Sequence, residues 1–323
     1  MTSQYSKIHN SIDPIRIGTR DSELALWQAR TVQEKLEALG LNTMLKPVKS
    51  QGDLNLTQPL YEMGITGIFT KTLDLALLND EIDIAVHSLK DVPTQLPHGM
   101  IQAAVLQRAS HIDILVHKPH FNPDDVSTIA TGSLRRKAQW LHGNPHHEVV
   151  DLRGNVNSRL RKLLENETWD AAIFAKAGLE RIGLLSKLKS IYGLEYTKLD
   201  SFIAAPAQGA MMVACMTNNG AVVEATARLN HRETQICVDL ERQFLRYLEG
   251  GCTAPIGANA YIKDNRIHLT GSLTALDGKQ HLVSYGHLSL DNLDSSAFAK
   301  AESEKILLKG GSQILEAIAQ ESK

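Results

Sequence analysis

The stretch IDIAVHSLKDVP, at residues 82–93, constrains the fold more than any other part of the sequence. A short apolar run after a helical pattern is typical of a parallel strand buried on both faces, so we predict a strand over residues 82–86. Polar and ionisable residues follow it directly: His87, Ser88, Lys90 and Asp91. Ligands of open α/β sheets bind just beyond the carboxyl ends of such strands, and Pro93 disfavours a helix before it. The segment thus presents an amine and an acid at a strand end, although a solvated pair in an ordinary loop explains it equally well.

Length and charge bound the class of protein. The 323 residues correspond to about two or three domains of ordinary size, and 43% hydrophobic and 22% charged residues describe an ordinary globular chain. The formal net charge of −2 argues against a general nucleic-acid binder, which needs an excess of Lys and Arg to hold phosphates. Any basic site must therefore be local.

The cysteines and the N-terminal residues indicate the compartment. Cys215, Cys237 and Cys252 form no CxxC pair and show no metal-ligand spacing, which favours a reducing compartment. Residues 1–14 lack the basic and then apolar pattern of a signal peptide, and no apolar run is long enough to span a bilayer. We therefore expect a cytoplasmic protein without a membrane segment.

Basic residues recur where a predicted strand leads into a predicted helix. We predict such strands over residues 15–19, 128–131, 148–152 and 171–175. The arginines at or just beyond these strand ends are Arg20, Arg135, Arg136, Arg153, Arg159 and Arg181. Their rigid donor forks match carboxylates, and so many guanidinium groups near one cleft suit a ligand with several carboxylates. Solvated arginines on helix faces would explain any one of them, but less readily the whole set.

Other polar residues complete this candidate site. Ser22 can cap the helix after the first strand, and Ser133 stands at the start of the helix after the strand at residues 128–131. Asp91 is the only acid that we expect among the arginines. An ionised carboxylate there can stabilise a developing cation and orient a ring N–H, which suits a reaction with a positively charged intermediate. Arg161 and Lys162, further into a helix, are expected to be solvated.

Cys252 lies in LEGGCTAPIGANA, where glycines and a proline predict an exposed loop. A thiol beside backbone amides and basic residues ionises more readily, and the thiolate is the nucleophilic form, although a loop cysteine is more often inert. We expect Cys215 and Cys237 to be structural. Four histidines in turn-like segments have no matching acid or cysteine, so we expect them at the surface and predict no metal: His98, His142, His146 and His147.

The order of elements predicts two α/β lobes and a smaller domain. LLNDEIDIAVHSLKD in the first half resembles LLENETWDAAIFAKAG in the second, as expected for two doubly wound lobes. Residues 202–216 are expected to return to the first lobe, and a helix is expected over residues 224–248. The alternating tail that follows predicts an α+β domain. We assign residues 1–107 with 202–220 to the first lobe, 108–201 to the second and 221–323 to the C-terminal domain.

The sequence resembles the porphobilinogen deaminase (hydroxymethylbilane synthase) family in five segments that keep the family's order: AVHSLKD, TGSLRRKAQ, LRGNVNSRL, AGLERIG and LEGGCTAPIG. The resemblance runs from residue 15 to about residue 260. It implies two lobes like those of periplasmic binding proteins, a third domain, and an enzyme of tetrapyrrole synthesis. Such an enzyme joins four porphobilinogen units head to tail with loss of ammonia, and water releases the linear hydroxymethylbilane. Nothing in the sequence demands more than a monomer.

The resemblance also implies a dipyrromethane cofactor, built from the enzyme's own substrate and joined by a thioether to the loop cysteine, here Cys252. Asp91 matches the catalytic aspartate, which holds the pyrrole N–H groups and stabilises the azafulvenium cation formed when ammonia leaves. The other residues expected to bind the cofactor are Lys90, Ser22, Ser133, Arg135 and Arg136. The residues expected to bind substrate carboxylates are Arg20, Arg153, Arg159 and Arg181. The only partner implied is the small molecule porphobilinogen.

The sequence departs from the family pattern at two places. Glu62 and Thr66 stand where the family usually has lysines, and Gly132 with Ser133 replaces paired serines. A carboxylate at position 62 that faced the cofactor would repel carboxylates. We therefore expect the chemistry to survive with altered loop contacts.

Two other classes of protein fit parts of the sequence. A two-lobed binding protein for a small polycarboxylate would explain the duplicated lobes and the arginines, but not the third domain, the loop thiol or the missing export signal. A nucleic-acid binder that uses SLRRK is disfavoured by the overall charge.

Overall fold

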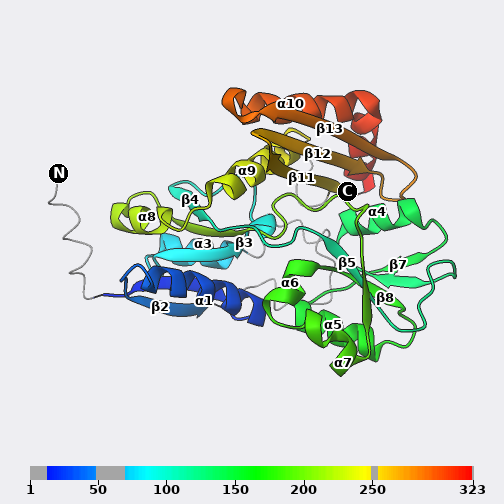
Figure 1. Ribbon diagram of the computed structural model, residues 1–323, viewed down its shortest axis with the longest axis horizontal. Coiled ribbons are helices and arrows are strands. Elements are labelled where there is room, and N and C mark those ends of the chain that lie inside the picture. Colours follow the sequence, from blue (N-terminus) through cyan, green and yellow to red (C-terminus); the bar gives the residue numbers. More distant parts are fainter. Residues whose placement is uncertain (1–12, 49–69, 249–253, 322–323) are drawn as a thin grey trace. The chain divides into compact units, whose positions relative to one another are not determined.

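The computed structural model describes residues 13–48, 70–248 and 254–321 (Figure 1). Within these ranges the chain forms two compact units. The first contains residues 13–48, 70–108 and 210–235, and the second contains residues 109–209, 236–248 and 254–321. The chain therefore leaves the first unit, builds a large part of the second, returns to the first and ends in the second.

The first unit is built on a five-stranded sheet, which we call the first lobe together with its helices. The strand order is β2-β1-β3-β10-β4. The strands are β1 (Ile15–Arg20), β2 (Thr43–Val48), β3 (Ile84–Ser88), β4 (Met100–Val105) and β10 (Met211–Met216). β1 pairs in parallel with β2 and β3, whereas β10 is antiparallel to both β3 and β4. The helices are α1 (Glu23–Glu37), α3 (Lys71–Leu78) and α8 (Gly220–Ala227).

The amphipathic pattern of α1 explains how it packs on this sheet. Its buried residues are Gln28, Ala29, Val32 and Leu36, which recur at helical spacing on one face. Val32 and Leu36 join Ile17, Ile84 and Val213 of the strands in one apolar core. Each such side chain, fully buried, stabilises the fold by roughly 1.5–3 kcal/mol.

The second unit contains another five-stranded sheet, which with its helices we call the second lobe. The strand order is β7-β6-β8-β5-β9. The strands are β5 (Asp113–His117), β6 (Thr128–Ala130), β7 (Glu148–Val150), β8 (Ala171–Ala175) and β9 (Glu195–Lys198). β6 is parallel to β7 and β8, and β5 is antiparallel to β8 and β9. The helices are α4 (Leu134–Gly143), α5 (Val156–Glu165), α6 (Lys176–Arg181) and α7 (Leu188–Tyr192).

The two five-stranded sheets have the same spatial arrangement of parallel and antiparallel strands, although β10 follows the other strands of its sheet in the sequence and the equivalent β5 precedes those of its own. β3 and β8 hold equivalent positions, because each lies between a parallel strand and an antiparallel one. The two similar segments noted in the sequence end in these two strands. The predicted pair of doubly wound α/β lobes is therefore confirmed.

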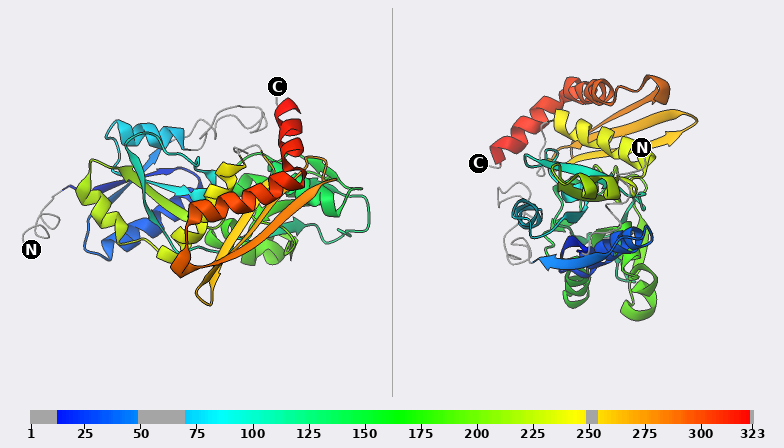
Figure 2. Two further views of the ribbon diagram at one scale, coloured as in Figure 1. Left: turned by 90° about the horizontal axis from the view of Figure 1, so that it is seen from above. Right: turned by 90° about the vertical axis from the view of Figure 1, so that its left-hand side faces the viewer.

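A three-stranded antiparallel sheet and its helices complete the second unit (Figure 2). The elements are α9 (Arg232–Tyr247), β11 (Ile256–Lys263), β12 (Arg266–Thr274), β13 (His281–Ser289), α10 (Ser295–Ile306) and α11 (Ser312–Glu321). Gly271 lies against the ring of Phe244 in α9, and Gly286 lies against Phe298 and Glu302 in α10. Any side chain on these two glycines would overlap the helices, which thus pack closely on one face of the sheet. This agrees with the predicted small α+β fold of the tail.

The helix expected over residues 224–248 is wrong, because the chain forms two helices there. α8 ends at Ala227 and α9 begins at Arg232. Between them, the side chain of Asn230 accepts a hydrogen bond of 2.8 Å from the N–H of Val105, and the N–H of His231 donates to the Val105 carbonyl at 2.7 Å. These bonds to the edge strand β4 take residues 230–231 out of a helical path.

The strand at the centre of the first lobe begins two residues later than predicted, at Ile84. Asp83 is occupied with another contact: its carboxylate accepts from the N–H of Arg16 at 2.7 Å and from the guanidinium Nε of Arg16 at 3.0 Å. Asp83 also makes a backbone hydrogen bond to β1, since its N–H donates to the carbonyl of Arg16 at 2.9 Å. By contrast, β8 has the predicted bounds.

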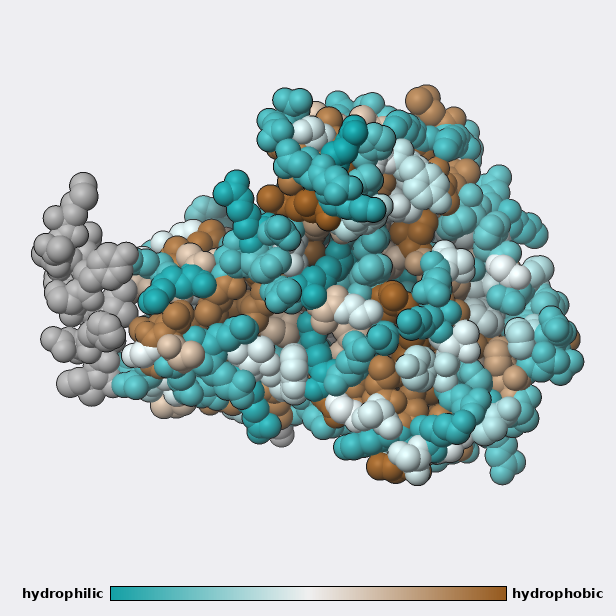
Figure 3. Space-filling view, in the orientation of Figure 1, coloured by the Kyte–Doolittle hydropathy of each residue, from teal (hydrophilic) through white to brown (hydrophobic). Residues whose placement is uncertain are grey.

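The visible face in Figure 3 is mostly hydrophilic, with hydrophobic residues scattered across it. Strongly exposed apolar side chains such as Val126, Ile191 and Leu308 belong to separate elements. Single residues of this kind are normal on a protein surface. Among the helices of the described residues, none is both long enough and apolar enough to cross a membrane.

Candidate active site

In the first lobe, the predicted site residues lie at the carboxyl ends of two neighbouring parallel strands. Arg20 is the last residue of β1, and the pairing of Gly18 with Ala85 puts Arg20 level with His87 of β3. Asp91 lies in the turn that directly follows β3. Open α/β sheets bind ligands at such an edge.

Ser22 caps α1 as predicted. Its backbone is extended, with φ −69° and ψ 147°, and its hydroxyl oxygen accepts a hydrogen bond from the N–H of Ala25 at 3.4 Å. The buried hydroxyl of Thr19 donates to the carbonyl of Ala25 at 2.9 Å. Both bonds hold the turn that carries Arg20 against the first turn of α1, and the hydroxyl proton of Ser22 can still be donated.

His87 lies buried at this edge, with 6% of its surface exposed. Burial, and after it the positive charge of Arg20, lower the pKa of His87 to about 4. The imidazole is therefore neutral at neutral pH and adds no charge beside Arg20.

Lys90 and Asp91 lie in a short 3₁₀ turn, Leu89–Asp91. Leu89 is fully buried, and its N–H donates to the carbonyl of Ala210 at 3.0 Å. Val92 then returns to extended backbone, with φ −89° and ψ 130°, as expected for a residue before proline. The half-buried side chains of Lys90 and Asp91 are thus presented from an anchored backbone.

In the second lobe, the carboxyl ends of three neighbouring parallel strands carry the predicted residues. Ser133 follows β6 and caps α4, because its hydroxyl oxygen accepts from the N–H of Arg136 at 3.4 Å. Arg153 follows β7, Arg159 lies in α5, and Arg181 ends α6 after β8. Since β7, β6 and β8 are adjacent and parallel, these residues share one edge of the sheet.

Arg135 and Arg136 bind a buried acid that the sequence analysis left out. Asp113 begins the antiparallel strand β5, so it lies at the same edge, opposite Ala175. Its Oδ2 accepts from Nη2 of Arg135 at 2.8 Å, and its Oδ1 accepts from Nη2 of Arg136 at 2.8 Å and from Nε of Arg136 at 3.1 Å. The prediction that Asp91 is the only acid among the arginines is therefore wrong. A buried acid in the run HIDILVH needed a partner, and this was the missed signal.

Gln208 completes what we call the Asp113 cluster: Asp113, Arg135, Arg136 and Gln208. Its Nε2 donates to Oδ1 of Asp113 at 2.8 Å. The remaining guanidinium nitrogens also meet protein oxygens, since Nη1 of Arg136 donates to the carbonyl of Ile173 at 3.1 Å and Nη1 of Arg135 to that of Ile203 at 2.9 Å. Two guanidinium groups share one carboxylate, so one positive charge remains. Burial lowers the pKa of Arg135, against the opposing charge of Asp113.

One nitrogen of this cluster is buried without a protein acceptor. Nε of Arg135 has no hydrogen-bond partner among the described residues, and Arg135 is only 5% exposed. A buried donor without an acceptor is costly. This N–H is suited to an oxygen atom of a bound ligand.

Arg153 and Arg181 are also largely removed from water. Burial lowers the pKa of Arg153, with Asp151 opposing the shift. Burial likewise lowers the pKa of Arg181 to about 10, with Glu180 opposing, so this guanidinium is charged at neutral pH. Its Nη2 donates to the carbonyl of Gly209 at 2.7 Å.

Gly132 brings the turns after β6 and β7 together. A Cβ atom on Gly132 would lie 2.6 Å from the carbonyl oxygen of Leu152 and 3.8 Å from Cδ of Arg153. The first distance is too short for a real contact. The departure from the paired serines therefore coincides with a close approach that places Ser133 beside the turn carrying Arg153.

The interpretation of the six arginines as solvated surface residues does not hold. Arg135 and Arg136 are 5% exposed and Arg153 is 6% exposed, and the other three are half-buried. Arg161 is exposed, as expected. The expectation for Lys162 is wrong, because this half-buried side chain donates to the carbonyl of Arg153 at 3.1 Å.

One of the four histidines expected at the surface is buried. His147 is 5% exposed, accepts from Nε1 of Trp140 at 3.3 Å and makes a 3.0 Å hydrogen bond with the carbonyl of Pro123. It packs against the Trp140 ring, which explains its burial. His98, His142 and His146 are exposed. Within the described ranges, no group of three or more His, Cys, Asp and Glu residues could hold a metal.

Cys252, Glu62 and Thr66 lie outside the described residues. Cys215 and Cys237 are buried, as expected for structural cysteines. Burial raises the pKa of Cys215, which keeps this thiol protonated.

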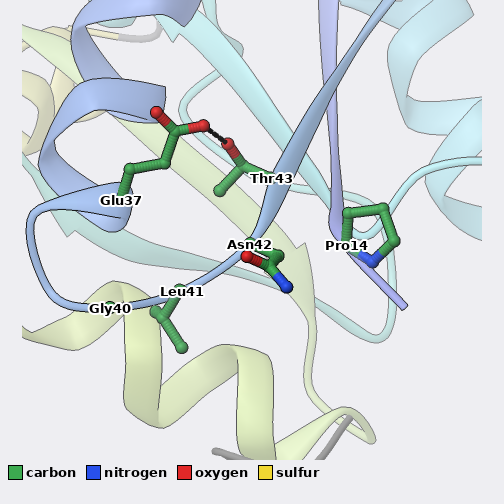
Figure 4. Close-up of a pocket in the computed structure, with 6 residues that line it drawn as sticks. All are labelled: Pro14, Glu37, Gly40, Leu41, Asn42 and Thr43. Atoms are coloured by element: carbon green, nitrogen blue, oxygen red, sulfur yellow. Dashed lines mark hydrogen bonds between the residues drawn. The ribbon is translucent and has the colours of Figure 1, made fainter. Parts of the chain in front are cut away.

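A hollow of about 510 Å³ lies at the opposite end of the first lobe's strands (Figure 4). It is lined by Pro14, Glu37, Gly40, Leu41, Asn42 and Thr43, which precede or begin β1 and β2 or end α1. Its acid is already engaged, since Glu37 accepts from the hydroxyl of Thr43 at 2.6 Å. Because the site residues lie at the carboxyl ends, this hollow is not part of the candidate site.

Comparison with known proteins identifies a family. The family model "Porphobilinogen deaminase, dipyromethane cofactor binding domain" matches residues 15–224, and "Porphobilinogen deaminase, C-terminal domain" matches residues 235–307. The porphobilinogen deaminase of Pelotomaculum thermopropionicum is 38% identical over 314 residues, which cover 96% of this chain and 98% of that protein. The porphobilinogen deaminase of Synechococcus elongatus is 38% identical over 313 residues, covering 94% and 95% of the two chains.

Among solved structures, a periplasmic substrate-binding protein of an ABC transporter from Coxiella burnetii aligns over 66% of this chain and 91% of its own. The TM-score is 0.38 and the identity 13%, which is too weak a likeness to carry a conclusion.

Duplicated α/β lobes that place cations at the carboxyl ends of their strands define a protein built to bind anionic ligands. The family matches then identify which family of anion-binding proteins this is. The chain belongs to the porphobilinogen deaminase family, whose members are transferases, and its two lobes fall within the dipyrromethane-cofactor-binding domain of that family.

Proposed function

We propose that the chain is a hydroxymethylbilane synthase, which joins four porphobilinogen molecules head to tail with loss of ammonia and releases the product with water. The observation that supports this most is the distribution of charge at the two carboxyl edges. One lobe presents Asp91 on an anchored turn, and the other presents buried arginines. Acetate and propionate groups on every pyrrole ring require such cations.

The residues present fit the family's dipyrromethane cofactor. Guanidinium groups, an ammonium group and hydroxyls match its carboxylates, and the buried Nε of Arg135 offers a donor to one of them. When bound, the cofactor supplies the anchored pyrrole to which substrate is added. We assign the thioether to Cys252 and the remaining contacts to Lys90, Asp91, Ser22, Ser133, Arg135 and Arg136.

Within that set, Arg136 acts differently from Arg135. Its Nε and Nη2 bind Asp113 and its Nη1 binds a backbone carbonyl. Arg136 therefore holds Asp113 in place, and Asp113 in turn orients Arg135 toward the ligand.

Asp91 is the catalytic residue in this proposal. Its carboxylate accepts hydrogen bonds from pyrrole N–H groups and stabilises the positive charge that develops as ammonia leaves the substrate. A fixed acceptor stabilises that charge without having to reorganise during the reaction. The anchored backbone of the turn supplies this rigidity.

Four arginines bind the substrate's carboxylates in this proposal: Arg20, Arg153, Arg159 and Arg181. The charges of Arg153 and Arg181 are partly desolvated, as the lowered pKa values of both groups indicate. A carboxylate gains more from a guanidinium in a poorly hydrated site than from one in open water.

Several further expectations belong to the same proposal. The three-domain division, with bounds 1–107 with 202–220, 108–201 and 221–323, is one of them. We also propose a cytoplasmic monomer that acts on a small molecule and binds neither nucleic acid nor a membrane. The net charge of −2 supports the exclusion of nucleic acid.

Intact mass of the purified protein tests the proposal. We expect a covalent dipyrrole adduct that is lost in Cys252→Ala and kept in Cys237→Ala, the matched change at a buried cysteine. An unmodified chain that binds polycarboxylates without turning over porphobilinogen would instead identify a two-lobed binding protein.

The departures at Glu62 and Thr66 need a test of their own. If the loop carrying them contacts carboxylates, changing both residues to lysine should lower KM for porphobilinogen several-fold by adding positive charge. Unchanged steady-state kinetics would exclude such a role.

A further inference from the structure

Gln28 makes a buried contact that neither the sequence motifs nor the family assignment accounts for. It lies on the sheet-facing side of α1 and is 3% exposed. Its Nε2 donates to the hydroxyl of Ser88 at 2.9 Å, and the hydroxyl donates back to Oε1 of Gln28 at 3.3 Å. Both polar groups of the amide are therefore directed at one side chain, 60 residues away in the sequence.

Ser88 occupies the position from which the turn bearing Asp91 begins. It is the last residue of β3 and the residue before the 3₁₀ turn Leu89–Asp91. A serine at such a position commonly caps the turn with its hydroxyl, but Ser88 makes no cap hydrogen bond. Its hydroxyl is bound to Gln28 instead, so α1 holds the start of the turn.

The turn is thereby fixed by two different elements. The N–H of Leu89 donates to the carbonyl of Ala210, next to β10, at 3.0 Å. In addition, Gln28 holds Ser88 from α1, whose N-terminal cap is Ser22. The same helix thus links the turn after β1, which carries Arg20, to the turn after β3, which carries Asp91.

We propose that Gln28 is a positioning residue for the reaction, which fixes the direction of the Asp91 carboxylate by holding Ser88. The proposal rests on the proposed function, in which Asp91 is catalytic. Gln28 itself touches neither substrate nor cofactor. Its removal should leave the fold and the ligand contacts in place while allowing the turn to shift, and small misplacements of a catalytic group have large effects on rate.

The test compares three single variants: Gln28→Leu, Gln28→Glu and Ser88→Ala. Gln28→Leu keeps the approximate volume and removes both hydrogen bonds, and we expect kcat for porphobilinogen to fall roughly tenfold with KM changed less than about twofold. Gln28→Glu can still accept from the Ser88 hydroxyl, so it should recover part of the loss. Intact mass should show full cofactor loading in all three.

Gln33→Leu is the matched control. Gln33 lies on the same helix and donates to the hydroxyl of Thr43 at 3.0 Å, which joins α1 to β2 away from Asp91. We expect a wild-type kcat for this variant. Hydrogen exchange gives a readout apart from activity: amides of residues 88–92 should exchange faster in Gln28→Leu and at the wild-type rate in Gln33→Leu.

The double variant Gln28→Leu with Ser88→Ala should be no slower than either single one, because both remove the same contact. Multiplying losses, or a wild-type kcat in Gln28→Leu, would overturn the proposal. Asp91→Ala distinguishes a failure of the positioning role from a failure of the proposed function. If it is inactive while Gln28→Leu is fully active, only the positioning role is lost; if it is fully active, the proposed function fails first.

Discussion

The two lobes share one arrangement of strands, yet they place different chemical groups at the start of the antiparallel strand beside β3 and β8. In the first lobe, the antiparallel strand beside β3 begins at Met211, and the preceding Ala210 gives a backbone carbonyl to the turn of Asp91. In the second lobe, the antiparallel strand beside β8 begins at Asp113, which gives a carboxylate to two arginines. In the proposed function the first acid, Asp91, serves the ligand, whereas Asp113 is used within the structure. A duplicated scaffold can thus supply one reactive edge and one binding edge.

The largest expected effect is on kcat, when Asp91 of the first lobe is replaced. Asp91→Ala should lower kcat by about 10³-fold, because no other group in its turn can stabilise the developing positive charge. The melting temperature should stay at the wild-type value, since Asp91 is only half-buried. Steady-state assays and thermal melts of the same preparation measure both. Substantial residual activity would contradict the role of this acid and the contrast between the lobes.

The corresponding change in the second lobe should act on stability. Asp113→Asn leaves two buried guanidinium groups without their shared carboxylate, which should cost about 3–5 kcal/mol and lower the melting temperature by roughly 10 °C. Asp124→Asn, at an exposed position in the same lobe, is the matched control and should melt like wild type.

Arg136→Leu tests the same cluster by removing one of the positive partners of Asp113. It should lower stability and weaken cofactor loading, since it releases Asp113 from one of its two arginines. A wild-type rate with normal cofactor loading in Arg136→Leu would remove Arg136 from the site. A wild-type melting temperature in Asp113→Asn would show that the Asp113 cluster does not stabilise the lobe.

The lobes should also differ in their response to acid. His87 and Phe174 hold equivalent positions, each one residue before the end of its strand's pairing with the antiparallel neighbour. The folded state lowers the pKa of His87 from 6.5 to about 4, so the unfolded chain binds a proton that the folded protein excludes. This contribution to stability is fully present above pH 6.5 and is lost as the pH falls toward 4, by roughly 3 kcal/mol.

His87→Gln should remove that pH dependence, because glutamine does not titrate. Urea unfolding at pH 7 and at pH 4 measures it, with His98→Gln, an exposed histidine of the same lobe, as control. If the free energy of unfolding changed equally between pH 7 and pH 4 in wild type and in His87→Gln, His87 would be protonated as easily in the folded protein as in the unfolded chain.

The smallest expected effect compares the two serine caps. Ser22 follows the exposed Asp21, whereas Ser133 follows Gly132, which has no room for a side chain. Gly132→Ser should push the turn of Arg153 away and cost about 1–3 kcal/mol, with weaker cofactor loading. Asp21→Ser is the matched change in the first lobe and should be neutral. Unchanged stability and cofactor loading in Gly132→Ser would show that the turn at Leu152 can move without cost.

Local patterns in the sequence were enough to predict most of the strands and the serine cap at Ser22. β8 matched residue for residue, because the run AAIFA is apolar throughout and is bounded by charged residues. Ser22 was found because a capping serine before an amphipathic helix is a short-range signal, and Ser133 was predicted at the start of its helix. Arg20 lies at its strand end as predicted, and Arg135, Arg136 and Arg153 follow theirs closely, whereas Arg159 lies within α5 and Arg181 ends α6.

Long-range contacts explain what the sequence did not reveal. Asp113 lies 22 residues from Arg135 and 95 from Gln208, so no local pattern reveals that this acid neutralises one guanidinium of the pair. Gln28 and Ser88 meet across 60 residues. The break between α8 and α9 depends on Val105 of an edge strand, which lies outside any helical window.

The path of the chain between the units has a consequence for synthesis. The position between β3 and β4 is filled by Met211–Met216, a segment that follows the entire second lobe in the sequence. On the ribosome, the earlier four strands of the first sheet emerge without the strand that separates β3 from β4, and a complete second lobe must emerge before that strand arrives. A nascent chain that ends after residue 198 but before residue 211 has every strand of the later sheet and lacks one strand of the earlier sheet.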